Sequence, residues 1–251
     1  MKKIIIIFYF LLSVINSYSQ QWGQLGNTIN GNVNLGALGT SVATNDEGNI
    51  IAVGIPSRDD WGYFGTSSEK GMVQVYIRDS VTLDWVQLGG NLIGEENGER
   101  FGAAIDLNHD GTVLAVGAPL SGSCGSNSSW DDCGYIKIYK WIDSTSTWIM
   151  AQKICGEGGW QGQGGSSVAL DYDGNTVVFG MPLQYGTSSS NRGEVEVYRE
   201  DNNGNWNQIG EFDPVWTYDK GFGAAVDISN SGDIVVVGAP GTRWWKCIFI
   251  H

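Results

Sequence analysis

Four sequence markers recur at matching intervals along this chain of 251 residues. In each repeat a tryptophan precedes a strand-opening glycine by 17 residues, and a turn glycine and an xGxP corner follow. Successive copies of every marker are 63, 63 and 58 residues apart. The tryptophans are Trp22, Trp85, Trp148 and Trp206, the opening glycines Gly39, Gly102, Gly165 and Gly223, the turn glycines Gly48, Gly111, Gly174 and Gly232, and the corners 53–56, 116–119, 179–182 and 237–240. Markers that keep one phase indicate an internal structural repeat.

Each repeat is predicted to form four short strands joined by turns. In the second repeat, β-type residues at 103–107 and 112–116 flank the segment Asn-His-Asp-Gly at 108–111. Such a segment between β-type runs predicts a hairpin, because Asn, Asp and Gly tolerate positive φ and bond their own backbone. A third, alternating strand follows a variable loop and ends in a tyrosine, and a fourth strand begins at a tryptophan. The tyrosines are Tyr76, Tyr139 and Tyr198.

The repeat predicts an all-β fold, a β-propeller of four-stranded antiparallel blades. A sheet of this size with an apolar face is not stable alone and must stack on copies of itself. Radial stacking gives a propeller, whereas a β-sandwich, the alternative, does not show such a sequence period. About four blades are expected, around residues 39–94, 102–157, 165–214 and 223–251. The repeated tryptophans and tyrosines are expected in the core and between blades.

The fourth repeat is shorter than the others and ends in the sequence GTRWWKCIFIH. In one interpretation, residues 244–250 form an improvised third strand, and the N-terminal strand 22–29 completes this last blade and closes a four-bladed ring. In the other, the chain is a fragment of a larger propeller. Closure is the prediction for this chain, because open sheet edges invite aggregation.

Residues 1–19 are predicted to be a secretory signal peptide. Lys2 and Lys3 precede an apolar run at 4–15, and a small-x-small cleavage pattern ends at Ser19. The formal charge of −13 becomes more negative when this segment is removed. A secreted acidic chain is a poor candidate for binding nucleic acid or anionic membranes. No later segment is long and apolar enough to span a membrane.

The pairing of Phe-Gly with a later Val-Gly-Ala-Pro resembles the FG-GAP repeat. Phe101-Gly102 with residues 116–119, and Phe222-Gly223 with residues 237–240, carry the resemblance, which covers residues 20–242. FG-GAP repeats build the propeller of integrin α-subunits and occur in many secreted bacterial proteins. The resemblance therefore implies a propeller of integrin α-like type and a role in binding or cell adhesion, although propellers host many activities.

The integrin type of this repeat implies a Ca²⁺ loop of the pattern DxDxDGxxD in the first hairpin. The second repeat offers Asp106, Asn108 and Asp110 before Gly111, but its ninth position is Leu114 rather than an acid. Calcium requires six to eight oxygen ligands. An Asx-rich turn, whose side chains bond local backbone, is favoured here. Asp106, Asn108 and Asp110 are kept as a possible Ca²⁺ site, and no other cofactor is predicted.

The loops that follow the xGxP corners, and the connections between repeats, are rich in aromatic residues. In a propeller with its first strand innermost, both sets of loops emerge on the same face. Exposed aromatic rings beside carboxylates suit sugar rings or a protein partner. The alternative is that the rings fold down over their own blades. The candidate ligand-binding residues are Trp61, Tyr63, Phe64, Trp130, Asp131, Trp160, Tyr185 and Trp216.

Cysteine spacing predicts a disulfide between Cys124 and Cys133, which would close a short loop in an oxidising compartment. Cys155 is then left to pair with Cys247. No HExxH or GxSxG motif occurs. The predicted function is a secreted, non-enzymatic binding or adhesion module. The alternative is a carbohydrate-active enzyme, a glycosidase or lyase, that uses carboxylates such as Asp59 with Asp60, or Glu95 with Glu96 and Glu99.

Overall fold

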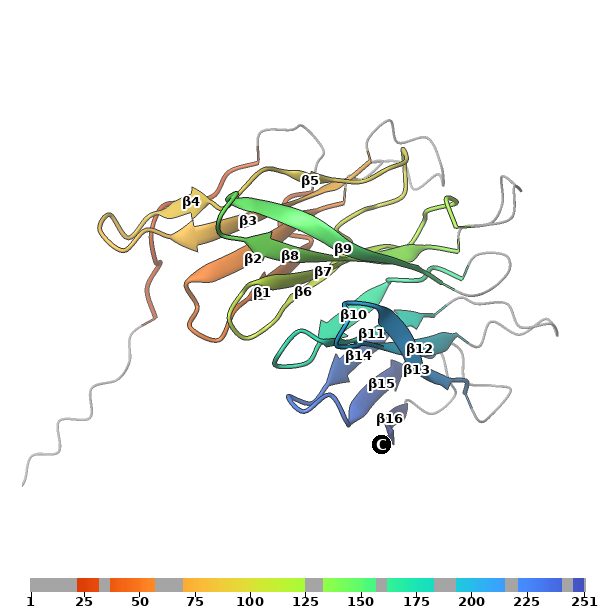
Figure 1. The fold of residues 1–251 in the computed structure, drawn as a ribbon. Helices are drawn as coiled ribbons and strands as arrows, with labels where there is room; N and C mark the ends of the chain where they lie inside the picture. The colour runs from red at the N-terminus through yellow and green to blue at the C-terminus, as the bar shows by residue number, and fades with distance from the viewer. Residues whose placement is uncertain are drawn as a thin grey trace, which may run out of the picture.

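The structure, a computed structural model, describes residues 22–31, 37–56, 70–124, 133–156, 162–182, 193–214 and 221–240, and the backbone of 246–250. Within these residues all regular structure is β-strand, in four antiparallel sheets (Figure 1). The first sheet contains β1 (Ser41–Thr44), β2 (Ile50–Ile55), β3 (Met72–Arg78), β4 (Trp85–Gln87) and β5 (Leu92–Ile93). The second contains β6 (Ala104–Leu107), β7 (Val113–Ala118), β8 (Tyr135–Ile142) and β9 (Thr147–Cys155).

The third sheet contains β10 (Ser167–Leu170), β11 (Thr176–Met181), β12 (Glu194–Glu200) and β13 (Trp206–Phe212), and the fourth contains β14 (Ala225–Ile228), β15 (Val235–Ala239) and β16 (Lys246–Ile250). Strand order within each sheet follows the chain. In the first sheet, β4 and β5 both pair with β3, so together they take the place of β9 and β13. The predicted hairpin at 103–116 is confirmed as β6 and β7 in the register Leu107↔Leu114.

The four sheets stack in chain order, as the predicted propeller requires. β1 packs on β6, β6 on β10 and β10 on β14, so the first strand of each sheet is innermost. An apolar core fills each of the three gaps between consecutive sheets. Both faces of β7 and β11 are buried, because each lies between two sheets. Among the described residues no comparable contact joins β14 to β1.

Hydrogen bonds between turns tie the sheets together at one end. The amide of Asp46 donates to the carbonyl of His109, His109 donates to Tyr172, and Tyr172 donates to Asn230, at 3.0, 3.1 and 3.2 Å. These four residues are 63, 63 and 58 positions apart. The rings of His109 and Tyr172 also stack, with centroids 3.8 Å apart. The repeat therefore fixes the contacts between sheets as well as the strands within them.

Two expectations about the chain ends have different outcomes. The improvised third strand is observed: β16 pairs with β15 in the register Gly238↔Cys247. The closing strand at 22–29 is not observed, because no residue of 22–31 pairs with the last sheet in the described structure. This segment instead lies on the first sheet, where Trp85 Nε1 donates to the carbonyl of Leu25 at 3.0 Å.

A tight turn before each first strand predicts a stabilising substitution. Arg100 has a φ of 59°, its carbonyl accepts the amide of Ala103, and its side chain is exposed. Glycine occupies the same position of the fourth repeat as Gly221, also with positive φ. We expect Arg100→Gly to raise the free energy of unfolding by about 1 kcal/mol, because glycine adopts this conformation without strain.

Urea unfolding checks this prediction against Arg78→Gly as a matched control. Arg78 lies in β3, where φ is not positive, so its replacement should lower stability by about 0.5–1 kcal/mol. Destabilisation by both substitutions would contradict the strain assigned to Arg100.

Candidate functional site

All eight candidate ligand-binding residues, Trp61, Tyr63, Phe64, Trp130, Asp131, Trp160, Tyr185 and Trp216, lie outside the described residues, as do Asp59 and Asp60. The strands that carry their loops are described. Six of these eight residues belong to loops that leave the ends of β2, β7 and β11 and enter the starts of β3, β8 and β12, all at the same edge of their sheets. Trp160 and Trp216 belong to the connections that follow β9 and β13 at that edge. We call this edge of the molecule the loop face.

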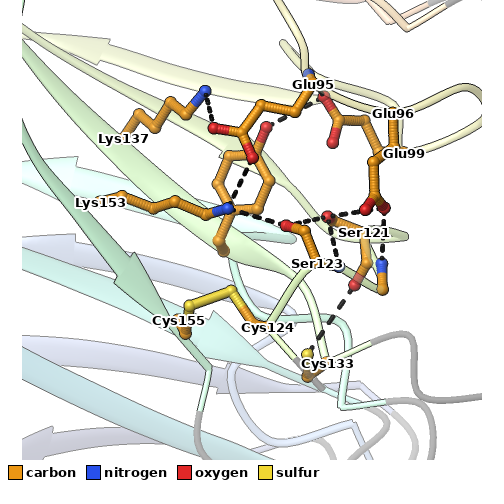
Figure 2. Close-up of polar contacts among 12 residues, drawn as sticks. Glu95, Glu96, Glu99, Ser121, Ser123, Cys124, Cys133, Lys137, Lys153 and Cys155 are labelled. Carbon is orange, nitrogen blue, oxygen red and sulfur yellow. Dashed lines mark hydrogen bonds and ion pairs between the residues drawn. A yellow bond between two sulfur atoms is a disulfide. The ribbon is translucent and has the colours of Figure 1, made fainter. Parts of the chain in front are cut away.

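On the loop face of the second sheet, polar side chains joined by hydrogen bonds and ion pairs form a polar cluster (Figure 2). It draws on the connection after β5, the connection after β7, and strands β8 and β9. Its members are Glu95, Glu96, Glu99, Ser121, Ser123, Tyr135, Lys137 and Lys153. The cluster therefore links the exit of the first sheet to the second.

Two lysines lie side by side in this cluster and share one carboxylate. Antiparallel pairing places Lys137 of β8 directly opposite Lys153 of β9, and like charges in such a pair repel. Glu95 lies between them, with its two oxygens 2.8 Å from Lys137 Nζ and 2.7 Å from Lys153 Nζ. These hydrogen bonds, first to Lys137 and then to Lys153, lower the pKa of Glu95 and keep it ionised.

Glu99 has the opposite environment. Its side chain is fully buried, and its Oε1 accepts hydrogen bonds from the Tyr135 hydroxyl at 2.9 Å and from the Glu95 amide at 2.5 Å. Burial raises the pKa of Glu99. Two carboxyls with pKa values moved apart are typical of an acid–base pair, but a fully buried Glu99 cannot touch a substrate. The pair instead anchors the connection 94–99 against β8.

The disulfide prediction is wrong in its pairing. Cys124 bonds to Cys155, so neither Cys124–Cys133 nor Cys155–Cys247 forms. The thiol of Cys133 is buried and faces the carbonyl of Ser121 at 3.9 Å. The reason is the sheet: Cys155 ends β9 opposite Tyr135, which brings it beside the connection that follows β7 (Figure 2). This bond joins the corner loop after β7 to the end of β9 on the same face.

The possible Ca²⁺ ligands are occupied by backbone hydrogen bonds. Asp106 accepts the amides of Leu107 at 2.9 Å and Leu170 at 2.7 Å, Asn108 accepts the amide of Val113 at 2.8 Å, and Asp110 accepts the amide and hydroxyl of Thr112. Within the described ranges, no group of three His, Cys, Asp or Glu side chains could hold a metal ion.

The Asn108 position has the same role in every repeat. Asn45, Asp171 and Ser229 stand at this position in the other repeats, and each side-chain oxygen accepts two backbone amides of its own turn. Because Asn, Asp and Ser all perform it, the role needs an acceptor and no charge, which supports the Asx-type turn.

We expect calcium to leave the protein unchanged. Binding would require Asp106, Asn108 and Asp110 to release amides that they already satisfy. Titration to millimolar Ca²⁺ should therefore not move the melting temperature. A rise in melting temperature that Asp110→Ala abolished would contradict this prediction.

Asp106 makes stability depend on pH. It lies half-buried between the second and third sheets, and burial raises its pKa from 3.8 to about 6, against the two amide hydrogen bonds that lower it. The folded chain thus holds this proton more tightly than the unfolded chain. Its contribution to stability is present below about pH 4 and is lost as the pH rises through 6.

From pH 4.5 to 7.5, the wild-type protein should therefore lose about 2 kcal/mol more unfolding free energy than Asp106→Ala. Alanine is a suitable replacement, because Ala43 and Ala169 stand at this position in the first and third repeats. Urea unfolding at several pH values gives the comparison. Parallel pH profiles would show that Asp106 titrates normally.

Sequence reasoning missed Lys137 and Lys153. A signal was present in the repeat: positions 74, 137 and 196 are Gln, Lys and Glu, while the flanking residues stay Val or Ile. The partners of these side chains change in the same way. Gln74 forms a hydrogen bond with the neutral Asn91, whereas Glu196 pairs across the sheet with the acidic Glu211. In the third sheet, burial and then Glu196 raise the pKa of the adjacent Glu194 to about 9. The same strand position is thus neutral in the first sheet, basic in the second and acidic in the third.

The fold defines the chain as a β-propeller whose closure is not observed among the described residues, and the strand ends that carry its loops lie at one edge. No protein-family model and no curated protein matches the chain, so the FG-GAP resemblance is not confirmed at that level. Solved structures similar to it include the Dos1 propeller, at 16% identity and a TM-score of 0.46, and Kuenenia stuttgartiensis hydrazine synthase, at 11% and 0.48. The matches cover 79% and 82% of this chain, but only 41% and 57% of those chains.

Proposed function

We propose that this chain is a secreted, non-enzymatic propeller of the FG-GAP type that binds a protein or a carbohydrate through its loop face. The observation that carries the proposal is the Cys124–Cys155 bond, which fixes a variable corner loop to the end of strand β9 of the second sheet. Fixed strands beneath variable loops are the usual layout of a binding surface. The aromatic loop residues would supply the contact area.

The polar cluster supports binding rather than catalysis. Its partly exposed members, Glu95, Lys153 and Ser123, offer a carboxylate, an ammonium and a hydroxyl that are already joined by short hydrogen bonds. Such groups can bond sugar hydroxyls or a peptide backbone. A glycosidase needs a proton donor in contact with the sugar, and Glu99, the carboxyl with the raised pKa, is buried.

A disulfide agrees with an oxidising compartment, as the signal peptide predicts. Across the described residues no helix is long and apolar enough to cross a membrane.

The test is a glycan array, with capture of secreted and surface proteins as its second arm. For the ligand found, Trp61→Ala and Trp130→Ala should each weaken binding at least tenfold, as central aromatic contacts do. Val81→Ala is the control, because this side chain is 86% exposed in the turn between β3 and β4 and lies outside these loops. Equal losses in all three variants, or hydrolysis of a polysaccharide that Asp59→Asn or Asp60→Asn abolishes, would overturn the proposal.

A further inference from the structure

The two terminal sheets of this open stack each leave one face bare within the described structure. On the first sheet the bare face includes Val42 and Ile51, which together with the more buried Val53 line an apolar hollow of about 280 Å³. Val42 is 69% exposed. At the same position of the later repeats, Ile105 is buried in the core between the first two sheets, and Val168 and Val226 pack against the cores of the next two gaps. The first sheet thus presents the surface that its copies bury.

Two glycines mark the missing contact. Each xGxP glycine touches the next repeat so closely that a methyl group on Gly54, Gly117 or Gly180 would overlap the carbonyl oxygen of Gly102, Gly165 or Gly223, respectively. Gly238 is the fourth of these glycines, and among the described residues the nearest neighbour of its methyl position would lie 3.5 Å away, within its own sheet. Gly39 is the first of the opposing glycines, and no described residue lies within 4 Å of its methyl position. Both halves of a contact that the chain makes three times are therefore uncovered.

The N-terminal segment already occupies the place of an outer strand in front of the first sheet. Trp148 Nε1 donates to the carbonyl of Leu88, which directly follows the outer strand β4 of the preceding sheet, at 3.1 Å. Trp85 Nε1 makes the same bond to Leu25, 63 residues earlier. Gly89 and Gly26 follow these carbonyls, both with positive φ. Residues 22–27 are thus held where the fourth strand of a preceding sheet would run.

The last sheet has the matching deficit, because three strands of it are observed among the described residues, whereas the second and third sheets have four. We propose that a second copy of this chain meets both needs. The last sheet of one copy docks on the first sheet of the other and takes residues 22–29 of that copy as its fourth strand. Two such contacts, each joining different surfaces, close a ring of eight sheets, which is within the range of propellers.

One polar contact specifies the register of this interface. Within the chain, Asp106 bonds Leu107 through one oxygen and Leu170 of the next sheet through the other. Asp227 holds the same position in the last sheet and bonds Ile228 through one oxygen. The repeat assigns its second oxygen to the amide of Thr44 in the other copy, where the spacing places the equivalent of Leu170.

Sedimentation of the purified protein tests the proposal with one variant for each surface. Val42→Asp charges the bare face of the first sheet, and Gly238→Ala adds a methyl group where Gly39 of the other copy would lie. Wild type should sediment at about 10 µM as two copies, and each variant should raise the apparent dissociation constant at least about 100-fold, because the ring holds by two linked contacts. Val81→Asp, at an 86% exposed turn position of the same sheet, should remain a dimer.

Mixing the variants gives the sharper result. Gly238→Ala keeps an intact first sheet and Val42→Asp keeps an intact last sheet, so an equimolar mixture should form a mixed dimer through one contact. A monomeric wild type, as closure within one chain or packing by further repeats would give, overturns the proposal. A dimer that resists both substitutions, or a mixture that stays monomeric, also overturns it.

Discussion

We expect Gly117→Ala to unfold the protein or leave it without a cooperative transition. The added methyl group would overlap the carbonyl oxygen of Gly165, and the carbonyl carbon would lie 2.9 Å away. Both atoms are backbone, so the second and third sheets must separate to admit the methyl group. We expect a loss of at least about 4 kcal/mol, large against a typical total stability of about 5–15 kcal/mol.

Gly238→Ala is the matched control. Neither glycine has a positive φ, and each is the next-to-last residue of the strand that leads into an xGxP corner. The two differ in their neighbours: the backbone of the next sheet faces Gly117, whereas the nearest described neighbour of Gly238 belongs to its own sheet. At protein concentrations low enough to keep the chain monomeric, this control should change the unfolding free energy by less than about 1 kcal/mol. Far-ultraviolet circular dichroism during urea unfolding measures both variants. A Gly117→Ala protein as stable as its control would show that consecutive sheets are not in close backbone contact.

The second large effect should come from reducing the disulfide. Cys124 and Cys155 are 31 residues apart, and a loop of that size is worth about 3.5 kcal/mol in the chain-entropy account of cross-links. Dithiothreitol, Cys124→Ser and Cys155→Ser should each lower the unfolding free energy by about this amount. The double replacement should cost no more than either single one, because both remove the same bond.

The Cys133→Ser variant distinguishes the observed Cys124–Cys155 disulfide from the Cys124–Cys133 disulfide that the sequence predicts. The thiol of Cys133 lies outside the observed bond, so the variant should keep the full sensitivity of its melting temperature to dithiothreitol. Thiol titration of the denatured, unreduced variants gives a second measurement. Loss of the dithiothreitol effect in Cys133→Ser would contradict the observed pairing.

The polar cluster shows where sequence reasoning reached its limit. Glu95, Glu96 and Glu99 were expected to act together as carboxylates, and they do lie together, but in different environments. Glu95 is ionised between two lysines, while Glu99 is buried under Tyr135. Those environments come from β8 and β9, more than 35 residues further along the chain. The residues near a carboxylate in the local sequence therefore do not reveal which charged side chains of a distant strand will contact it.

The cysteines show the same limit. Separation along the chain favoured Cys133 for Cys124, since nine residues close a shorter loop than 31. Cys155 is nevertheless adjacent, because the β8–β9 hairpin returns the chain to the loop face. The direction of β8 and β9, and not the separation along the chain, therefore decides which cysteine pairs with Cys124.

The sequence by itself determined the sheets of this protein. Hairpins and turns depend on residues a few positions apart, so glycine, Asn and Asp at a fixed period specify the same local structure four times. Stacking follows from the repeat as well, because each sheet buries the same apolar face against its neighbour. Only the tertiary structure decided that the stack is open among its described residues, which cysteines pair and which carboxyls are buried. These depend on contacts between residues far apart in the chain, where spacing carries no information about distance.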